Sequence, residues 1–169
     1  LRQPNISIRD GKLRWVDRML QQPEVDLTAV NVSMRNGLRS HAMRFDATPP
    51  PEWGQPISIQ GHFNQALLNS RASDVSTWKG SFYAQMPHVD TSRLAVYAKE
   101  YLGMELLSGE GWVRAWVDID HGVWNNQTLD VSLKELKIKW AKQLDVIHLK
   151  QIEGRLRMQS WMGGLGQEV

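Results

Sequence analysis

Apolar and polar residues alternate with a period of two along most of the chain, which is the pattern of β-strands that have one apolar face. Glycine, proline, asparagine and aspartate separate the alternating stretches into short rows. These rows predict about ten strands, over residues 6–8, 13–15, 25–34, 43–47, 57–63, 78–86, 113–119, 129–133, 136–140 and 152–158. We therefore expect a mainly β protein built from an antiparallel sheet.

Two dipeptides between the rows favour tight turns. Asp10-Gly11 and Asn36-Gly37 consist of residues that tolerate positive φ, and each predicts a two-residue hairpin loop. The apolar positions change from odd to even numbers near Ala29, which predicts a β-bulge there. The prolines at 49–51 cannot donate ladder hydrogen bonds, so a strand should end before them.

One segment departs from the period of two and predicts a helix over residues 90–102. Pro87 closes the strand before it, Asp90 or Thr91 can cap its first turn, and Gly103 suits the position after its end. Its apolar stripe follows helical spacing and consists of Leu94, Tyr97, Ala98 and Tyr101. We expect this stripe to pack on the sheet as ordinary core.

The sequence contains no recognisable catalytic chemistry. It has no cysteine, and it lacks the common zinc-protease, hydrolase, P-loop and dinucleotide-binding motifs. Its five histidines have no pair at helical metal-ligand spacing. Asp118 and Asp120 near His121 are the one arrangement of acid and base, although this composition at a strand end is equally typical of a turn. We expect no enzyme activity, no metal and no cofactor.

Charge and hydropathy exclude two further classes of function. Twenty Lys and Arg against 18 Asp and Glu leave a net charge of +2, which argues against a nucleic-acid-binding protein. The longest apolar run, residues 94–98, is far shorter than the ~20 residues that span a bilayer. The chain opens without an initiator Met or a signal-peptide pattern, so we expect a segment of a longer protein whose anchor lies outside it.

Tryptophan is the one residue type in excess, with eight in the chain. Trp112 and Trp116 share a strand face with Arg114 and Asp118, opposite the apolar row of residues 113–119. Three interpretations are open: the helix covers this face, sugar rings stack on it, or it is a wall in contact with lipid. Which face of this strand lines a groove also remains open.

Four stretches, taken in their order and spacing, carry a resemblance to a known family. They are residues 6–15 (ISIRDGKLRW), 41–61 (HAMRFDATPP, then WG and ISIQG), 78–90 (WKGSFYAQMPHVD) and 109–118 (GEGWVRAWVD). Together they resemble the AsmA-like family of Gram-negative envelope proteins, specifically its large YhdP-type members. The resemblance covers nearly the whole chain, and the family has no catalytic signature to transfer.

The resemblance implies an antiparallel sheet curved into an open hydrophobic trough, a β-taco-like fold. Residues 1–169 would form one segment of a longer repetitive protein, with strands over about 5–86, a short helix over about 90–102 and strands over about 109–160. The family's function implies that phospholipid acyl chains move along the trough, between the inner and outer membranes. It also implies a periplasmic location, with an inner-membrane anchor outside this segment and no nucleic-acid partner.

The residue pattern agrees with a trough, because one face of successive strands is apolar and no second sheet's worth of sequence is left to cover it. Six residues in the apolar rows are the candidates for contact with acyl chains: Ile59, Phe63, Phe82, Val113, Val117 and Ile138. Two other classes remain as alternatives. A tryptophan-rich carbohydrate-binding β-sandwich would explain the tryptophan excess, whereas a hydrolase would need a convergent polar cluster that the sequence does not reveal.

Overall fold

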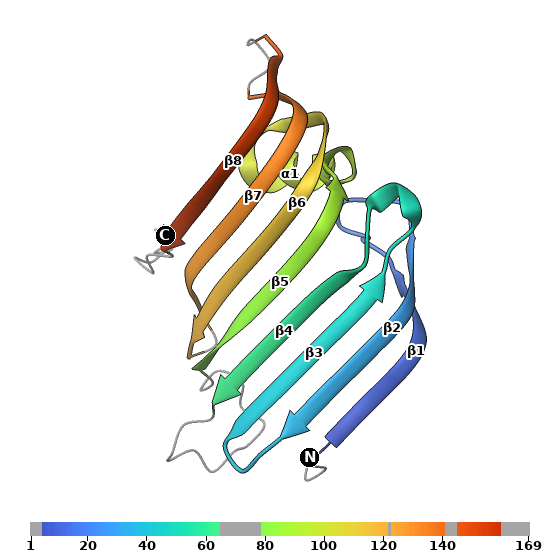
Figure 1. The fold of residues 1–169 in the computed structure, drawn as a ribbon, viewed down its shortest axis with the longest axis vertical. Helices are drawn as coiled ribbons and strands as arrows, with labels where there is room; N and C mark the ends of the chain where they lie inside the picture. Colours follow the sequence, from blue (N-terminus) through green and yellow to red (C-terminus); the bar gives the residue numbers. More distant parts are fainter. Residues whose placement is uncertain (1–4, 65–78, 122, 141–144, 160–169) are drawn as a thin grey trace, which may run out of the picture.

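The structure is a computed structural model, and it describes residues 5–64, 79–121, 123–140 and 145–159. Eight strands form one antiparallel sheet in which every strand pairs with its neighbour in the sequence (Figure 1). The strands are β1 (Asn5–Trp15), β2 (Val25–Asn36), β3 (Ser40–Thr48), β4 (Ile57–Asn64), β5 (Lys79–Asp90), β6 (Glu105–Asp120), β7 (Val123–Lys139) and β8 (Ile147–Gln159). The mainly β, antiparallel prediction is confirmed, and the sheet is not closed into a barrel.

Eight strands replace the expected ten because two of the expected breaks are distortions inside continuous strands. Asp10-Gly11 is not a hairpin turn: β1 runs straight through it, with Asp10 at a φ of 52° and a register shift beside it. β7 likewise runs without a break through Glu135, which has a φ of 49°. A positive φ supplies the extra residue of a bulge as readily as it supplies a turn, and here the neighbouring strand continues past both points.

Two other local predictions are confirmed, and a third is confirmed only in part. β2 and β3 form the expected hairpin, but Asn36-Gly37 is not its loop: Asn36 pairs with His41, and the Gly37 N–H donates to the Ser40 carbonyl (2.7 Å), so the turn lies between Gly37 and Ser40. Ala29 has a φ of 46° and lies where the register of β2 against β3 shifts, so the bulge is present. β3 ends at Thr48, immediately before the prolines.

The expected end of a strand at Pro87 is wrong. β5 continues to Asp90, and its register against β6 shifts between Met86 and Val89. Proline has no N–H to donate to the ladder, and a strand tolerates it where the pairing is irregular.

The helix forms where the pattern predicts it, in two parts: a 3₁₀ turn, η3 (Thr91–Leu94), followed by α1 (Ala95–Leu102). The Asp90 side chain caps the first part by accepting a hydrogen bond from the Ser92 N–H (2.9 Å). Gly103 ends the second part in the left-handed conformation, at a φ of 66°. A second 3₁₀ turn, η1 (Pro51–Trp53), links β3 to β4. No helix in the described ranges is long and apolar enough to cross a membrane.

The strand register divides the sheet into two chemically distinct faces. Residues paired across an antiparallel ladder point to the same face, so each rung crosses the sheet on one side. One rung contains only apolar residues on all eight strands: Ile8, Val32, Phe45, Ile59, Ala84, Ala115, Leu129 and Leu156. The next rung is polar over seven strands: Asn31, Asp46, Ser58, Gln85, Arg114, Asp130 and Arg155. We call these sides the apolar face and the polar face.

The chain leaves much more surface in contact with solvent than a closed fold of its size. It exposes 12782 Å², whereas a compact protein of this mass exposes roughly 8,500 Å². The buried apolar side chains in the described part are few and mostly small: Val25, Val30, Ala47, Val89, Ala98, Leu136 and Ile138. A single sheet has no opposite layer, so most of the apolar face is only half buried.

Candidate functional site

The apolar face is the candidate functional site, and five of the six residues selected from the sequence lie on it. Ile59 belongs to the apolar rung that crosses all eight strands. Phe82 on β5 pairs with Val117 on β6 two rungs from it in one direction, and Met86 pairs with Val113 two rungs from it in the other. The register therefore brings these positions together on one side of the central strands.

Two phenylalanine rings form the centre of this face. The rings of Phe63 and Phe82 meet edge to face, with their centroids 4.8 Å apart. They fill the space above Gly61, where an added Cβ would lie 2.8 Å from the Phe63 ring and 3.0 Å from the Phe82 ring. Because glycine has no side chain, both rings can pack against the backbone of β4 at this position. The result is a half-buried apolar floor.

Ile138 has a different environment from the other five candidates. It lies beyond the distortion at Glu135, pairs with Leu106 and Ile147, and is only 8% exposed. A side chain with so little exposed surface offers little contact area to a ligand. Its environment is that of a small local core near the end of β7.

The apolar side chains become more exposed toward both edges of the sheet. On β1, Ile8 is 53% exposed and Trp15 is 54% exposed; on β8, Leu156 is 56% exposed and Met158 is 48% exposed. Contiguous exposed apolar surface of this kind marks an interaction site in a natural protein. The apolar face thus extends as an accessible surface from one edge strand to the other.

One end of the apolar face forms a partly open cavity of about 250 Å³. Its walls come from Trp15, Val25 and Leu27 on the first two strands, from Ile57 on β4, and from Met86, His88 and Val89 on β5; Pro49, Trp53, Gln55, Leu94 and Tyr97 complete it. β1 and β5 are four strands apart, or ~19 Å in a flat sheet. They can line one cavity only because the sheet curls toward its apolar face at this end.

The polar face is crossed by ion pairs between side chains of neighbouring strands. Arg155 donates two hydrogen bonds to the Asp130 carboxylate (2.6 and 2.7 Å), and Arg14 does the same for Asp26 (2.8 and 3.3 Å). These hydrogen bonds hold the pKa of both carboxyl groups below its ordinary value and raise the pKa of both arginines. This face is therefore a hydrated, charge-paired surface.

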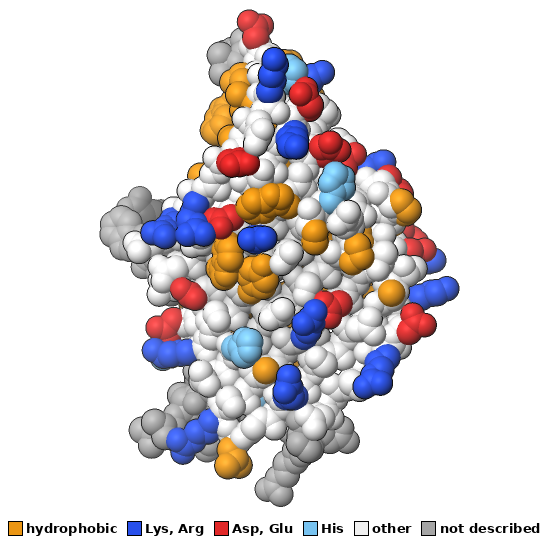
Figure 2. All heavy atoms as spheres, in the orientation of Figure 1, with side chains coloured by type: hydrophobic (Ala, Val, Ile, Leu, Met, Phe, Trp, Pro, Cys, Tyr) orange, Lys and Arg blue, Asp and Glu red, His pale blue; other side chains and the backbone are white. Residues whose placement is uncertain are grey.

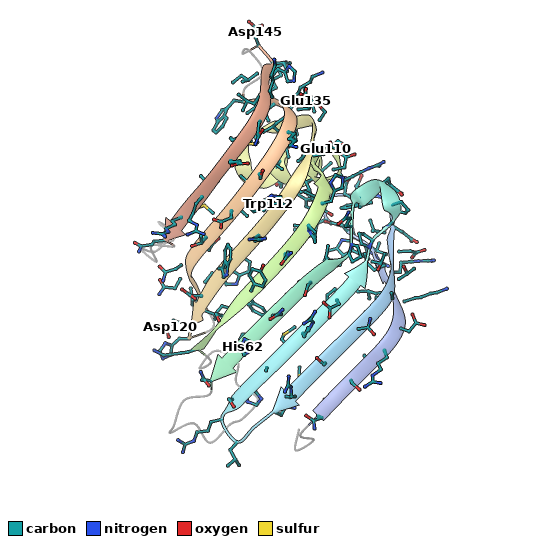
Figure 3. All side chains as sticks on the ribbon, in the orientation of Figure 1. His62, Glu110, Trp112, Asp120, Glu135 and Asp145 are labelled. Atoms are coloured by element: carbon teal, nitrogen blue, oxygen red, sulfur yellow. The ribbon has the colours of Figure 1, made fainter. Side chains whose placement is uncertain are left out.

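The polar face also carries an aromatic patch, visible as the orange area near the centre of Figure 2. Trp112 lies on this side in Figure 3, while α1 lies behind the sheet. The interpretation that the helix covers the tryptophan face is therefore wrong, and Leu94 and Tyr97 of the helical segment line the cavity on the apolar side instead. The sequence did not determine this choice because either face of β6 is apolar enough to accept a helix.

Cations already occupy positions over these indole rings. The Arg114 guanidinium lies 4.8 Å from the centre of the Trp112 ring, and Arg155 lies 5.9 Å from that of Trp116. Tyr83 packs against Trp116 at 5.2 Å. These are cation–π and aromatic contacts that stiffen the sheet surface. Stacking of a sugar needs an open face of the indole ring. A guanidinium already covers one face of each of these two rings, so that face is closed to a sugar.

The arrangement of acid and base near the end of β6 is an exposed salt-bridge cluster. Asp120 pairs with Lys79 (3.0 Å) and with His121, and the Lys79 hydrogen bond lowers the pKa of Asp120. Asp118 accepts a hydrogen bond from Asn126 (3.3 Å). Within the described residues, no three His, Asp or Glu side chains are close enough together to hold a metal ion.

Sequence reasoning missed the residues of the cavity. Trp15 was predicted only as a strand residue and Trp53 only as part of the stretch that resembles the family, although both line the cavity together with the helical residues Leu94 and Tyr97. The helical stripe was the available signal, because it had to face some part of the sheet. Which part depends on curvature, and the alternation of residues does not encode curvature.

The fold and the apolar face together define an open-sheet β-protein in which one face stays largely uncovered. The β-sandwich alternative fails on this ground, because the described part of the chain forms one sheet with no second sheet packed on it. The family model described as YhdP protein matches residues 1–164, and the chain belongs to this family. YhdP proteins are large envelope proteins linked to lipid transport. Comparison with curated proteins and with solved structures gave no match.

Proposed function

We propose that this chain carries phospholipid acyl chains along its apolar face, as one section of a periplasmic bridge between the inner and outer membranes. The observation that carries the proposal is the apolar rung on all eight strands, which stays accessible at both edges of the sheet. Alkyl chains gain roughly 25 cal/mol for each Å² of apolar surface they remove from water. Because the apolar face is continuous, an alkyl chain keeps this favourable free energy at every position as it moves across the sheet.

The polar face supports the same proposal from the other side. Its ion pairs and polar rungs keep the outer surface of the sheet in water. Eight strands at ~4.8 Å give this section a length of about 38 Å, instead of the ~48 Å that ten strands would give. In this proposal the chain binds and guides lipid without catalysis, and its membrane anchor belongs to another part of the protein.

Native mass spectrometry of the 169-residue chain tests the proposal. The chain is stripped of lipid, incubated with vesicles of phosphatidylethanolamine and phosphatidylglycerol, and separated from them before measurement. We expect adducts with the mass of intact phospholipid. A chain that is folded by circular dichroism but carries no lipid mass would overturn the proposal, and binding of soluble glycans instead would favour the carbohydrate class.

A further inference from the structure

We propose that the cavity at the curled end of the sheet binds a stretch of a single alkyl chain, as a covered site distinct from the open part of the apolar face. The inference rests on the proposed function, since it assigns an occupant to one section of the same face. Beyond the proposed function, it names a place on this face where side chains surround the hydrocarbon on several sides. We call this space the covered cavity.

The cover of this cavity comes from elements outside the sheet. Leu94 and Tyr97, from η3 and α1, line it from one side, and Trp53 of η1 lines it from another. An isolated bridge between Gly54 and Val89 attaches η1 to β5. At Gly54, with a φ of 130°, an added Cβ would lie 2.0 Å from the His88 carbonyl oxygen. The cover is thus attached through a close backbone contact that only glycine permits.

The size and the lining of the cavity indicate an apolar occupant. Among the described residues that line it, only Gln55 and His88 have strongly polar side chains. A water molecule in a protein interior needs two to four polar partners, and an apolar cavity of about 150 Å³ stays dry and accepts benzene. The covered cavity, at about 250 Å³, has room for a longer piece of hydrocarbon. The surface that lines it is almost wholly apolar, so a polar lipid head group would find few partners there.

The cavity is continuous with the open part of the apolar face. On β4, Ile57 is the next residue on the same side of the strand after Ile59. On β5, Met86 lines the cavity and pairs with Val113 on β6. An alkyl chain lying on Ile59 and Val113 can therefore extend between Ile57 and Met86 and reach the cavity while staying on apolar side chains. This continuity favours the alkyl chain of a lipid over an unrelated apolar molecule.

A photoreactive fatty acid tests the inference. The probe carries a diazirine ring in the middle of its alkyl chain, and after illumination the labelled residues of the 169-residue chain are located by peptide mass spectrometry. We expect adducts on the segment with Leu94 and Tyr97 as well as on the strands with Phe82 and Val117. The first segment reports the covered cavity, and the two strands report the open face.

Two variants that fill the cavity make the test more specific. Leu27→Trp fills it from the sheet, and Leu94→Trp fills it from the cover. If the first variant does not fold, the second is used. The matched control is Thr128→Trp, which adds the same ring on the polar face, away from the cavity lining and from the lipid-binding surface. We expect each filling variant to reduce labelling of Tyr97 at least fivefold while labelling of Phe82 and Val117 persists. The control should leave Tyr97 labelled.

The outcomes separate this inference from the proposed function. Labelling of Phe82 and Val117 without Leu94 or Tyr97 would overturn the covered site and leave transport along the open face intact. Equal labelling of Tyr97 in the filled and unfilled proteins would also overturn it. A folded chain with no label anywhere on the apolar face would contradict the proposed function itself. Labelling confined to the cavity would support the covered site and contradict movement along the open face.

Discussion

Phe82 and Val117 lie directly opposite each other on β5 and β6, and their neighbours Tyr83 and Trp116 form the corresponding pair on the other side of the sheet. Consecutive residues of each strand thus point to opposite faces: Phe82 and Val117 meet on the apolar face, whereas Tyr83 and Trp116 belong to the aromatic patch beside the arginines of the polar face. This relationship allows the two faces of a single strand to be tested independently.

Val117→Asp should abolish lipid binding and leave the fold in place. Val117 is only half buried, so water can still hydrate the new carboxylate in the lipid-free protein. We expect a loss of about 1–2 kcal/mol in the free energy of unfolding, the lower part of the cost of burying an unpaired polar group. An alkyl chain, by contrast, would have to cover the charge. Lipid binding by native mass spectrometry and a thermal melt check the two effects.

Two control variants make this prediction specific to the apolar face. Asp118→Asn changes the adjacent residue on the polar face, and Thr128→Asp adds a carboxylate beside Trp116 on that same face. Both should bind lipid as the unmodified chain does. If Val117→Asp unfolds the chain, this position is sealed core. If it folds and still binds lipid, the Trp112/Trp116 side becomes the binding face.

The open sheet should also be measurable as an expanded shape in solution. A compact chain of 169 residues has a radius of gyration of about 15.5 Å. The exposed surface of 12782 Å² belongs to a more extended particle, so small-angle scattering from the monomer should give a value at least several Å larger. A monomer at the compact value would mean that the sheet closes on itself in solution.

The period of two was sufficient to locate the strands, because the apolar face is continuous and every strand contributes to it. It was not sufficient to decide whether Asp10-Gly11 is a turn or a bulge. The same backbone conformation serves both, and the choice is made by β2, whose pairing with β1 extends on both sides of Gly11. The partner strand lies outside any local window of sequence.

The site shows the same division between local and long-range information. Alternation placed Phe82 and Val117 on the apolar face correctly, since a strand position determines its side. The burial of Ile138 depends on the distortion at Glu135 and on its pairing with Leu106, which lies 32 residues earlier in the chain (138 − 106). The covered cavity depends on curvature that brings Trp15 near Met86. Neither relationship appears in the local pattern.

Asp130 and Arg155 should make stability depend on pH below neutrality. The paired guanidinium lowers the pKa of Asp130 in the folded chain, so the unfolded chain binds a proton at a higher pH than the folded one does. The stabilisation is complete above the ordinary aspartate pKa of about 4. It is lost as the pH falls from there through the lower pKa of the folded state.

Urea denaturation of Asp130→Asn checks this sign. The difference in unfolding free energy between the unmodified chain and this variant should be constant above about pH 5 and shrink below about pH 4. Arg155→Gln is the matched variant, because it removes the donor and keeps the carboxylate. In an Arg155→Gln background, Asp130→Asn should have a smaller effect at neutral pH. Equal effects in the two backgrounds would show that the pair does not couple.

Gly111→Ala should destabilise the sheet far more than Gly103→Ala. Gly111 has a φ of 156°, and an added Cβ would lie 2.0 Å from the Ser132 carbonyl oxygen on β7. Because that oxygen belongs to the neighbouring strand, relief of the clash requires β6 and β7 to separate locally. We expect a loss of about 3 kcal/mol from strain and overpacking together. Gly103 has a φ of 66° with nothing within 4 Å, so alanine there adds only left-handed strain of about 1 kcal/mol. Thermal and urea denaturation of the two variants measure the difference, and equal losses would mean that β6 and β7 are not held together at Gly111.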